Sequence, residues 1–185
     1  MVPLQQYGFF MTTYPITTPF DESLFWMDKS LAYFESSKVL DDSSSEYKAM
    51  PIITLQAFSV ECSLKSLLLL TCGHYPAKHD SLVLFEGLPE NLKLDLSEQF
   101  LNEHECDLRI ALDETKGDFI GSRYHFEDFR TSYVGRSFST GYLEAVADFL
   151  IKYIRINGDG ISYQFGHSSS VTSSLDVTLS TRLEP

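Results

Sequence analysis

Apolar residues recur along the chain at helical spacing, separated by short polar breaks. After Thr18 they return every three to four residues, which predicts an amphipathic helix from about Pro19 to about Leu40. Thr18 suits the N-cap, Pro19 suits the first helical position, and acidic residues follow in the first turn. The apolar positions that define this helix are Leu24, Met27, Leu31 and Phe34.

The second apolar stretch predicts a helix from about Ile52 to about Cys72. Its apolar band is too broad for one face, which is typical of a helix at the centre of a bundle. Two charged residues interrupt the band. Glu61 and Lys65 stand at positions i and i+4 with the glutamate first, the favourable order for an ion pair on one helix face. Gly73 then predicts the C-cap.

Further helices are predicted downstream, each with a recognisable start or end. They are a short helix capped by Asp80 and ending near Glu86, one from about Glu90 to His104, one from about Leu108 to Arg130, and one from Ser139 or Thr140 to Ile154. A break is predicted near Lys116-Gly117, and Asn157-Gly158 predicts the end of the last helix.

The predicted fold is therefore all-α. We expect an antiparallel bundle of four or five helices over residues 19–156, an irregular N-terminal arm over residues 1–18 and a C-terminal tail over residues 157–185. The tail begins with "ISYQF" and alternates apolar and polar residues, which leaves a small hairpin or an irregular segment open. The length of 185 residues suits one domain.

Composition narrows the class of protein. Apolar residues make up 43% of the chain, enough to form a core, and the net charge is -12. That charge argues against nucleic-acid binding through bulk electrostatics, although a local basic patch stays open. The three cysteines form no CxxC motif and predict reduced thiols in a cytoplasmic protein. No apolar run is long enough to predict a membrane span, and no signal peptide is indicated.

Two segments contain candidate binding residues around the central helix. Charges on such a helix are partly desolvated and need partners, so Glu61 and Lys65 predict a polar network with Arg123 as its third member. That network is either structural or the wall of a ligand pocket inside the bundle. His79, which precedes the cap Asp80, marks either a structural turn or a ligand-binding position.

A third candidate segment is the polar stretch of Arg123, Tyr124 and His125 within an otherwise apolar helix. It predicts either a salt-bridged helix or a phosphate site in which Arg123 binds the anion and His125 transfers protons. No spacing of histidines, cysteines and acids indicates a metal site, and no Gly-rich loop or other motif indicates a cofactor.

Three stretches together resemble the HEPN family of helical domains. They are "AFSVECSLKSLL" over Ala57–Leu68, "YPAKHD" over Tyr75–Asp80 and "RYHFE" over Arg123–Glu127. Their order agrees with the predicted helices, and the resemblance covers roughly residues 20–156. It implies an up-and-down bundle that usually forms a homodimer.

The resemblance also implies a choice of functions. Many HEPN proteins are metal-independent ribonucleases of toxin–antitoxin or phage-defence systems, whereas others bind nucleotides or partner proteins. The nucleases use an arginine followed roughly four to six residues later by a histidine, and no arginine of this chain has that neighbour. We therefore expect a non-catalytic or degenerate module that binds a nucleotide, an RNA or a protein partner. The alternatives are a metal-independent ribonuclease with a rearranged site at Arg123 and His125, to which His79 could contribute across a dimer, and a dimeric scaffold without a ligand.

Overall fold

The computed structural model describes residues 16–116 and 140–164, without the side chains of residues 140, 159 and 162–164. Every regular element in these ranges is a helix, and no strand occurs there, so the predicted all-α class is confirmed. The helices are α1 (Pro19–Asp41), α2 (Ala49–Cys72), α3 (Ser81–Glu86), α4 (Glu90–His104), α5 (Leu108–Thr115) and α7 (Thr140–Gln164).

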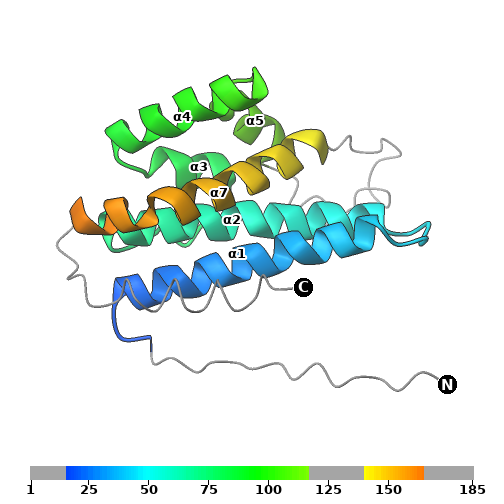
Figure 1. The fold of residues 1–185 in the computed structure, drawn as a ribbon, viewed down its shortest axis with the longest axis horizontal. Coiled ribbons are helices and arrows are strands. Elements are labelled where there is room, and N and C mark those ends of the chain that lie inside the picture. The colour runs from blue at the N-terminus through cyan, green and yellow to red at the C-terminus, as the bar shows by residue number, and fades with distance from the viewer. Residues whose placement is uncertain (1–15, 117–139, 165–185) are drawn as a thin grey trace.

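The first two predicted helices form an antiparallel pair. Figure 1 shows α1 and α2 side by side, joined by the short turn after α1, with α7 lying along the opposite side of α2. The short helices α3 and α5 pack between this layer and α4, which lies outermost in the view of Figure 1. The central position predicted for α2 is confirmed, because it contacts α1, α3 and α7.

The ends of the helices follow the capping chemistry of the sequence. Thr18 caps α1 in a capping box, in which its hydroxyl accepts from the Asp21 backbone N–H at 3.1 Å and the Asp21 carboxylate accepts from the Thr18 N–H at 2.9 Å. Gly73 ends α2 with a φ of 73°, in the left-handed region that favours glycine. Asp80 caps α3 by accepting from the Val83 N–H at 3.1 Å.

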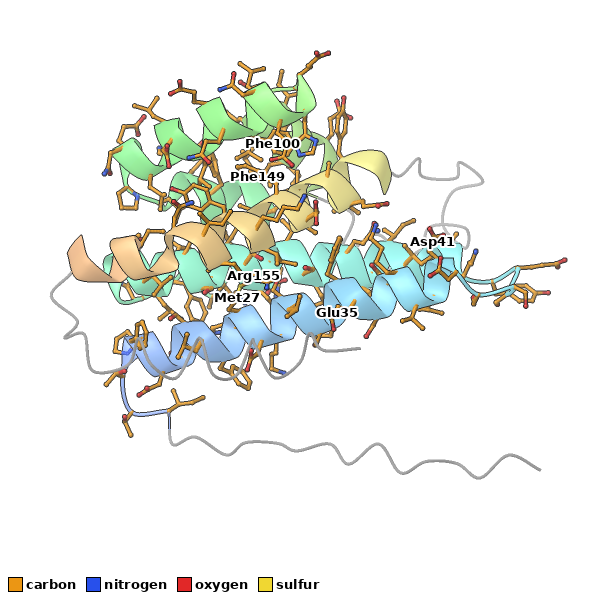
Figure 2. The ribbon with its side chains drawn as sticks, in the orientation of Figure 1. Met27, Glu35, Asp41, Phe100, Phe149 and Arg155 are labelled. Carbon is orange, nitrogen blue, oxygen red and sulfur yellow. The ribbon has the colours of Figure 1, made fainter. Side chains whose placement is uncertain are left out.

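The core forms around α2, whose leucines are buried by the helices on several sides. On its far side α4 packs on α7 through Phe100 and Phe149, whose rings meet edge to face with centroids 5.1 Å apart (Figure 2). Within the described residues α2 alone has the length and hydropathy of a membrane-spanning helix, and 83% of that window is buried by the rest of the protein. The same burial is expected of a core helix.

A line of serines lies between α1 and α2. Ser23, Ser30 and Ser37 recur every seven residues on α1 and are almost fully buried. The Ser30 hydroxyl lies 2.9 Å from the carbonyl oxygen of Ser59, to which it donates, and 2.7 Å from the hydroxyl of Ser63. A seven-residue repeat gives the shallow crossing of a coiled coil, and small residues at the seam bring the two backbones close together.

We expect Ser30→Leu to lower the free energy of unfolding by about 1–3 kcal/mol, because the larger side chain overpacks the seam between the two helices. Ser36→Leu is the matched control, since Ser36 is exposed on the same helix. Urea denaturation of both variants measures the difference. Equal midpoints for the two would show that the seam has room for a leucine.

The last helix is longer than predicted. Asn157-Gly158 does not end it, and α7 continues to Gln164. The helix continues there because Ile161 is buried in the core, and this packing outweighs the local tendency of Asn-Gly to stop a helix. The start of "ISYQF" is therefore helical rather than part of a hairpin. The predicted helix after Leu108 is described only as far as Thr115, and its remainder to Arg130 lies outside the described residues.

Candidate functional site

A buried ion pair lies near the middle of α2. The Lys65 ammonium donates to Glu61 Oε1 at 2.6 Å, and the two residues are 5% and 4% exposed. They meet because side chains four residues apart lie on one helix face. Removing both charges from water is costly, and their mutual attraction offsets this cost only with good geometry and further hydrogen bonds. The predicted pairing of these residues is confirmed.

Two aromatic rings enclose the ammonium of Lys65. Its Nζ lies 4.7 Å from the ring centroid of Trp26, on α1, and 5.1 Å from that of Tyr75, in the loop after α2. The two rings meet edge to face with centroids 5.7 Å apart. Aromatic faces attract a cation electrostatically, most strongly where water is excluded. The rings therefore replace part of the hydration that Lys65 loses on burial.

Glu22 fixes both rings from the first turns of α1. Its Oε1 accepts from the Tyr75 hydroxyl at 2.9 Å and from the Trp26 indole N–H at 3.2 Å. Burial, followed by the hydrogen bond to Glu22, raises the pKa of Tyr75 above its ordinary value. Tyr75 therefore stays a neutral donor at physiological pH.

His79 reaches the same carboxylate from the α2–α3 loop. Its Nδ1 lies 3.0 Å from Glu61 Oε1, and its side chain is 57% exposed. The turn at Gly73 and the cap at Asp80 hold the two ends of this loop. Because the partner is a carboxylate, Nδ1 carries a proton and donates it. The histidine thus connects the buried pair with the protein surface.

We name Glu22, Trp26, Glu61, Lys65, Tyr75 and His79 the Glu61 cluster. One of its polar atoms is left over: Glu61 Oε2 is buried and has no hydrogen-bond partner among the described residues. Such an acceptor ordinarily has a partner, and leaving it without one costs about 1–3 kcal/mol. The cluster therefore has an acceptor that nothing in the described part of the chain uses.

The charge of Glu61 also acts on its neighbour Cys62. Burial first, and the Glu61 carboxylate second, raise the pKa of the Cys62 thiol to about 12. The thiolate is the nucleophilic form of cysteine, so Cys62 is inert at physiological pH. It contributes to packing and not to the chemistry of the cluster.

The structure brings together three of the residues predicted from the sequence. Glu61 and Lys65 contact each other, and His79 contacts Glu61. The predicted third partner, Arg123, and the candidates Tyr124 and His125 lie outside the described residues.

The sequence reasoning missed the residues that surround the pair. Glu22, Trp26 and Tyr75 were not predicted as members of a site. The i, i+4 spacing of Glu22 and Trp26, the one tryptophan of the sequence, could have indicated that these two side chains meet. Tyr75 stands in the same short motif as His79. In residues 16–116 and 140–164, no group of three His, Cys, Asp or Glu side chains is placed to hold a metal ion.

Comparisons with protein-family models, with characterised proteins and with solved structures found no match for this chain.

Proposed function

We propose that this chain is a non-catalytic, HEPN-like helical module that binds a nucleotide, an RNA or a protein partner through the Glu61 cluster. The observation that supports this most directly is the buried Glu61–Lys65 pair with a leftover carboxylate oxygen and an exposed histidine beside it. Charged clusters inside helical bundles are frequent ligand sites.

The energetics of the pair favour a binding role over a purely structural one. Replacing a buried ion pair by apolar side chains of similar size is often neutral or stabilising. A core with leucines all around α2 would therefore be stable without Glu61 and Lys65. Polar groups that are kept in such a place, against the local packing pattern, are typical of functional positions.

The ribonuclease alternative depends on Arg123 and His125, both outside the described residues. The net charge of -12 disfavours a polyanionic substrate. RNA cleavage in the presence of EDTA that disappears in both Arg123→Ala and His125→Ala, with each variant folded, would favour the ribonuclease over the binding module. The proposed module is a homodimer, and light scattering that gives the monomer mass at tens of micromolar protein would contradict that part.

Two histidines in one loop provide a matched test of the binding site. We expect His79→Ala to weaken ligand binding about tenfold, the loss of roughly one hydrogen bond to a charged group, and His74→Ala to change it less than about twofold. His74 lies in the same loop and is also exposed, but its Nδ1 is 2.9 Å from the Cys72 carbonyl oxygen and not at the cluster.

Isothermal titration with ATP, GTP, a short oligoribonucleotide and an arginine-containing peptide measures the effect. These probes cover the three ligand classes of the proposal. If none of them binds, or if both histidine variants bind as the wild type does, the Glu61 cluster is structural and the scaffold alternative gains support.

A further inference from the structure

We infer that the ligand of the Glu61 cluster is a basic protein segment, one of whose arginine side chains donates a hydrogen bond to Glu61 Oε2. This inference rests on the proposed function and selects one of its three ligand classes. The choice of ligand class depends on which donors and acceptors of the cluster already have hydrogen-bond partners.

The polar hydrogens that the described contacts account for are all directed at carboxylates. The Trp26 indole and the Tyr75 hydroxyl donate to Glu22, and Lys65 and the Nδ1 of His79 donate to Glu61 Oε1. The leftover group is an acceptor, Glu61 Oε2. A ligand therefore complements this site with a donor.

Lys65 is poorly placed to bind a phosphate. Its ammonium faces the Glu61 carboxylate and the rings of Trp26 and Tyr75, and its side chain is almost completely buried. An anion would have to displace Glu61 and would then leave that carboxylate buried without its counter-ion, at a cost of several kcal/mol. A phosphate-bearing ligand is disfavoured at this position for that reason.

A cationic donor gains the most at Glu61 Oε2. Hydrogen bonds between charged groups are roughly twice as strong as neutral ones, and low polarity around a buried carboxylate strengthens them further. Arginine suits the position better than lysine because its guanidinium is planar and less strongly hydrated, so it loses less on leaving water.

The position lies just beneath the surface. His79 contacts the Glu61 carboxylate on one side and is more than half exposed on the other, so an incoming side chain that lies against the imidazole ring approaches the carboxylate. The net charge of -12 attracts a basic segment and speeds its encounter with the protein.

The test uses the full chain and fluorescent peptides in an anisotropy titration. One peptide is Gly-Arg repeated three times, and its control replaces each arginine by citrulline, which has nearly the same shape without the charge. We expect the arginine peptide to bind and the citrulline peptide to bind at least about tenfold more weakly, because a charged donor is lost.

Matched protein variants separate the site from bulk charge. Glu61→Gln and Glu98→Gln each remove one negative charge, and Glu98 is exposed on α4. We expect Glu61→Gln to weaken binding of the arginine peptide at least tenfold and Glu98→Gln less than twofold. Glu61→Asp keeps the charge but withdraws the carboxylate by one methylene, and we expect it to weaken binding too. Circular dichroism confirms that each variant is folded.

Several outcomes would overturn the inference. Equal weakening in Glu61→Gln and Glu98→Gln would show bulk electrostatic attraction only. Binding of ATP or an oligoribonucleotide that His79→Ala weakens, without binding of the arginine peptide, would leave the proposed function standing and exclude the basic partner. If no probe binds in a manner that depends on His79, the proposed function and this inference fail together.

Discussion

Lys65→Ala is expected to lower the free energy of unfolding by about 3–5 kcal/mol, because it leaves the Glu61 carboxylate buried with His79 as its one remaining described donor. The variant also empties the space between the rings of Trp26 and Tyr75. Urea denaturation followed by circular dichroism measures the loss. Many single domains have a total stability not far above this figure. Partial unfolding of Lys65→Ala without denaturant would therefore also agree with the prediction.

A second ion pair at the same spacing provides the control. Asp148 and Lys152 stand four residues apart on α7 with 2.6 Å between their charged atoms, but both are substantially exposed. We expect Lys152→Ala to cost less than about 0.5 kcal/mol, since exposed helical pairs contribute little. A loss in Lys65→Ala as small as that in Lys152→Ala would contradict the desolvated environment described for the pair.

The double variant Glu61→Gln/Lys65→Met extends this test. It removes both charges, so neither is left buried alone. We expect it to be more stable than Lys65→Ala by several kcal/mol, since the unpaired charge accounts for most of the single variant's loss. A double variant less stable than Lys65→Ala would show that the two charged residues stabilise the fold independently of each other.

The second large effect is expected on α4, where two leucines two positions apart differ fully in environment. Leu96 is 0% exposed and Leu94 is 63% exposed. We expect Leu96→Ala to cost about 2–5 kcal/mol, because it removes buried methyl groups and leaves a cavity. Leu94→Ala should stay within about 0.5 kcal/mol of the wild type. Similar midpoints in urea would mean that Leu96 is not buried in the core as described.

Most helices were predictable from the sequence because local chemistry marks their ends. Thr18-Pro19, Gly73 and Asp80 have capping roles that depend on near neighbours, and the structure places them as predicted. The end of α7 was not predictable in this way. The helix continues past Asn157 because Ile161 is buried, and this burial depends on residues far away in the sequence.

The candidate site was predictable only in part, for a similar reason. The i, i+4 spacing of Glu61 and Lys65 is a local signal, and the prediction that a buried pair needs a partner from elsewhere follows from electrostatics. The identity of that partner depends on how other segments fold back onto α2, and among the described residues it is His79. The aromatic enclosure by Trp26 and Tyr75 required knowledge of how α1 lies against α2.

The continuation of α7 past Asn157 has a consequence for local opening of the protein. Gly158 and Gly160 each lower helix stability by about 1 kcal/mol relative to alanine, and an added Cβ at either one meets no atom closer than 3.8 Å. The last two turns are therefore close to the balance between helix and coil, and the burial of Ile161 tips them towards helix. Backbone amides after Gly158 should exchange with deuterium through fraying of this end, well before those near Val146, which exchange only when the whole domain opens.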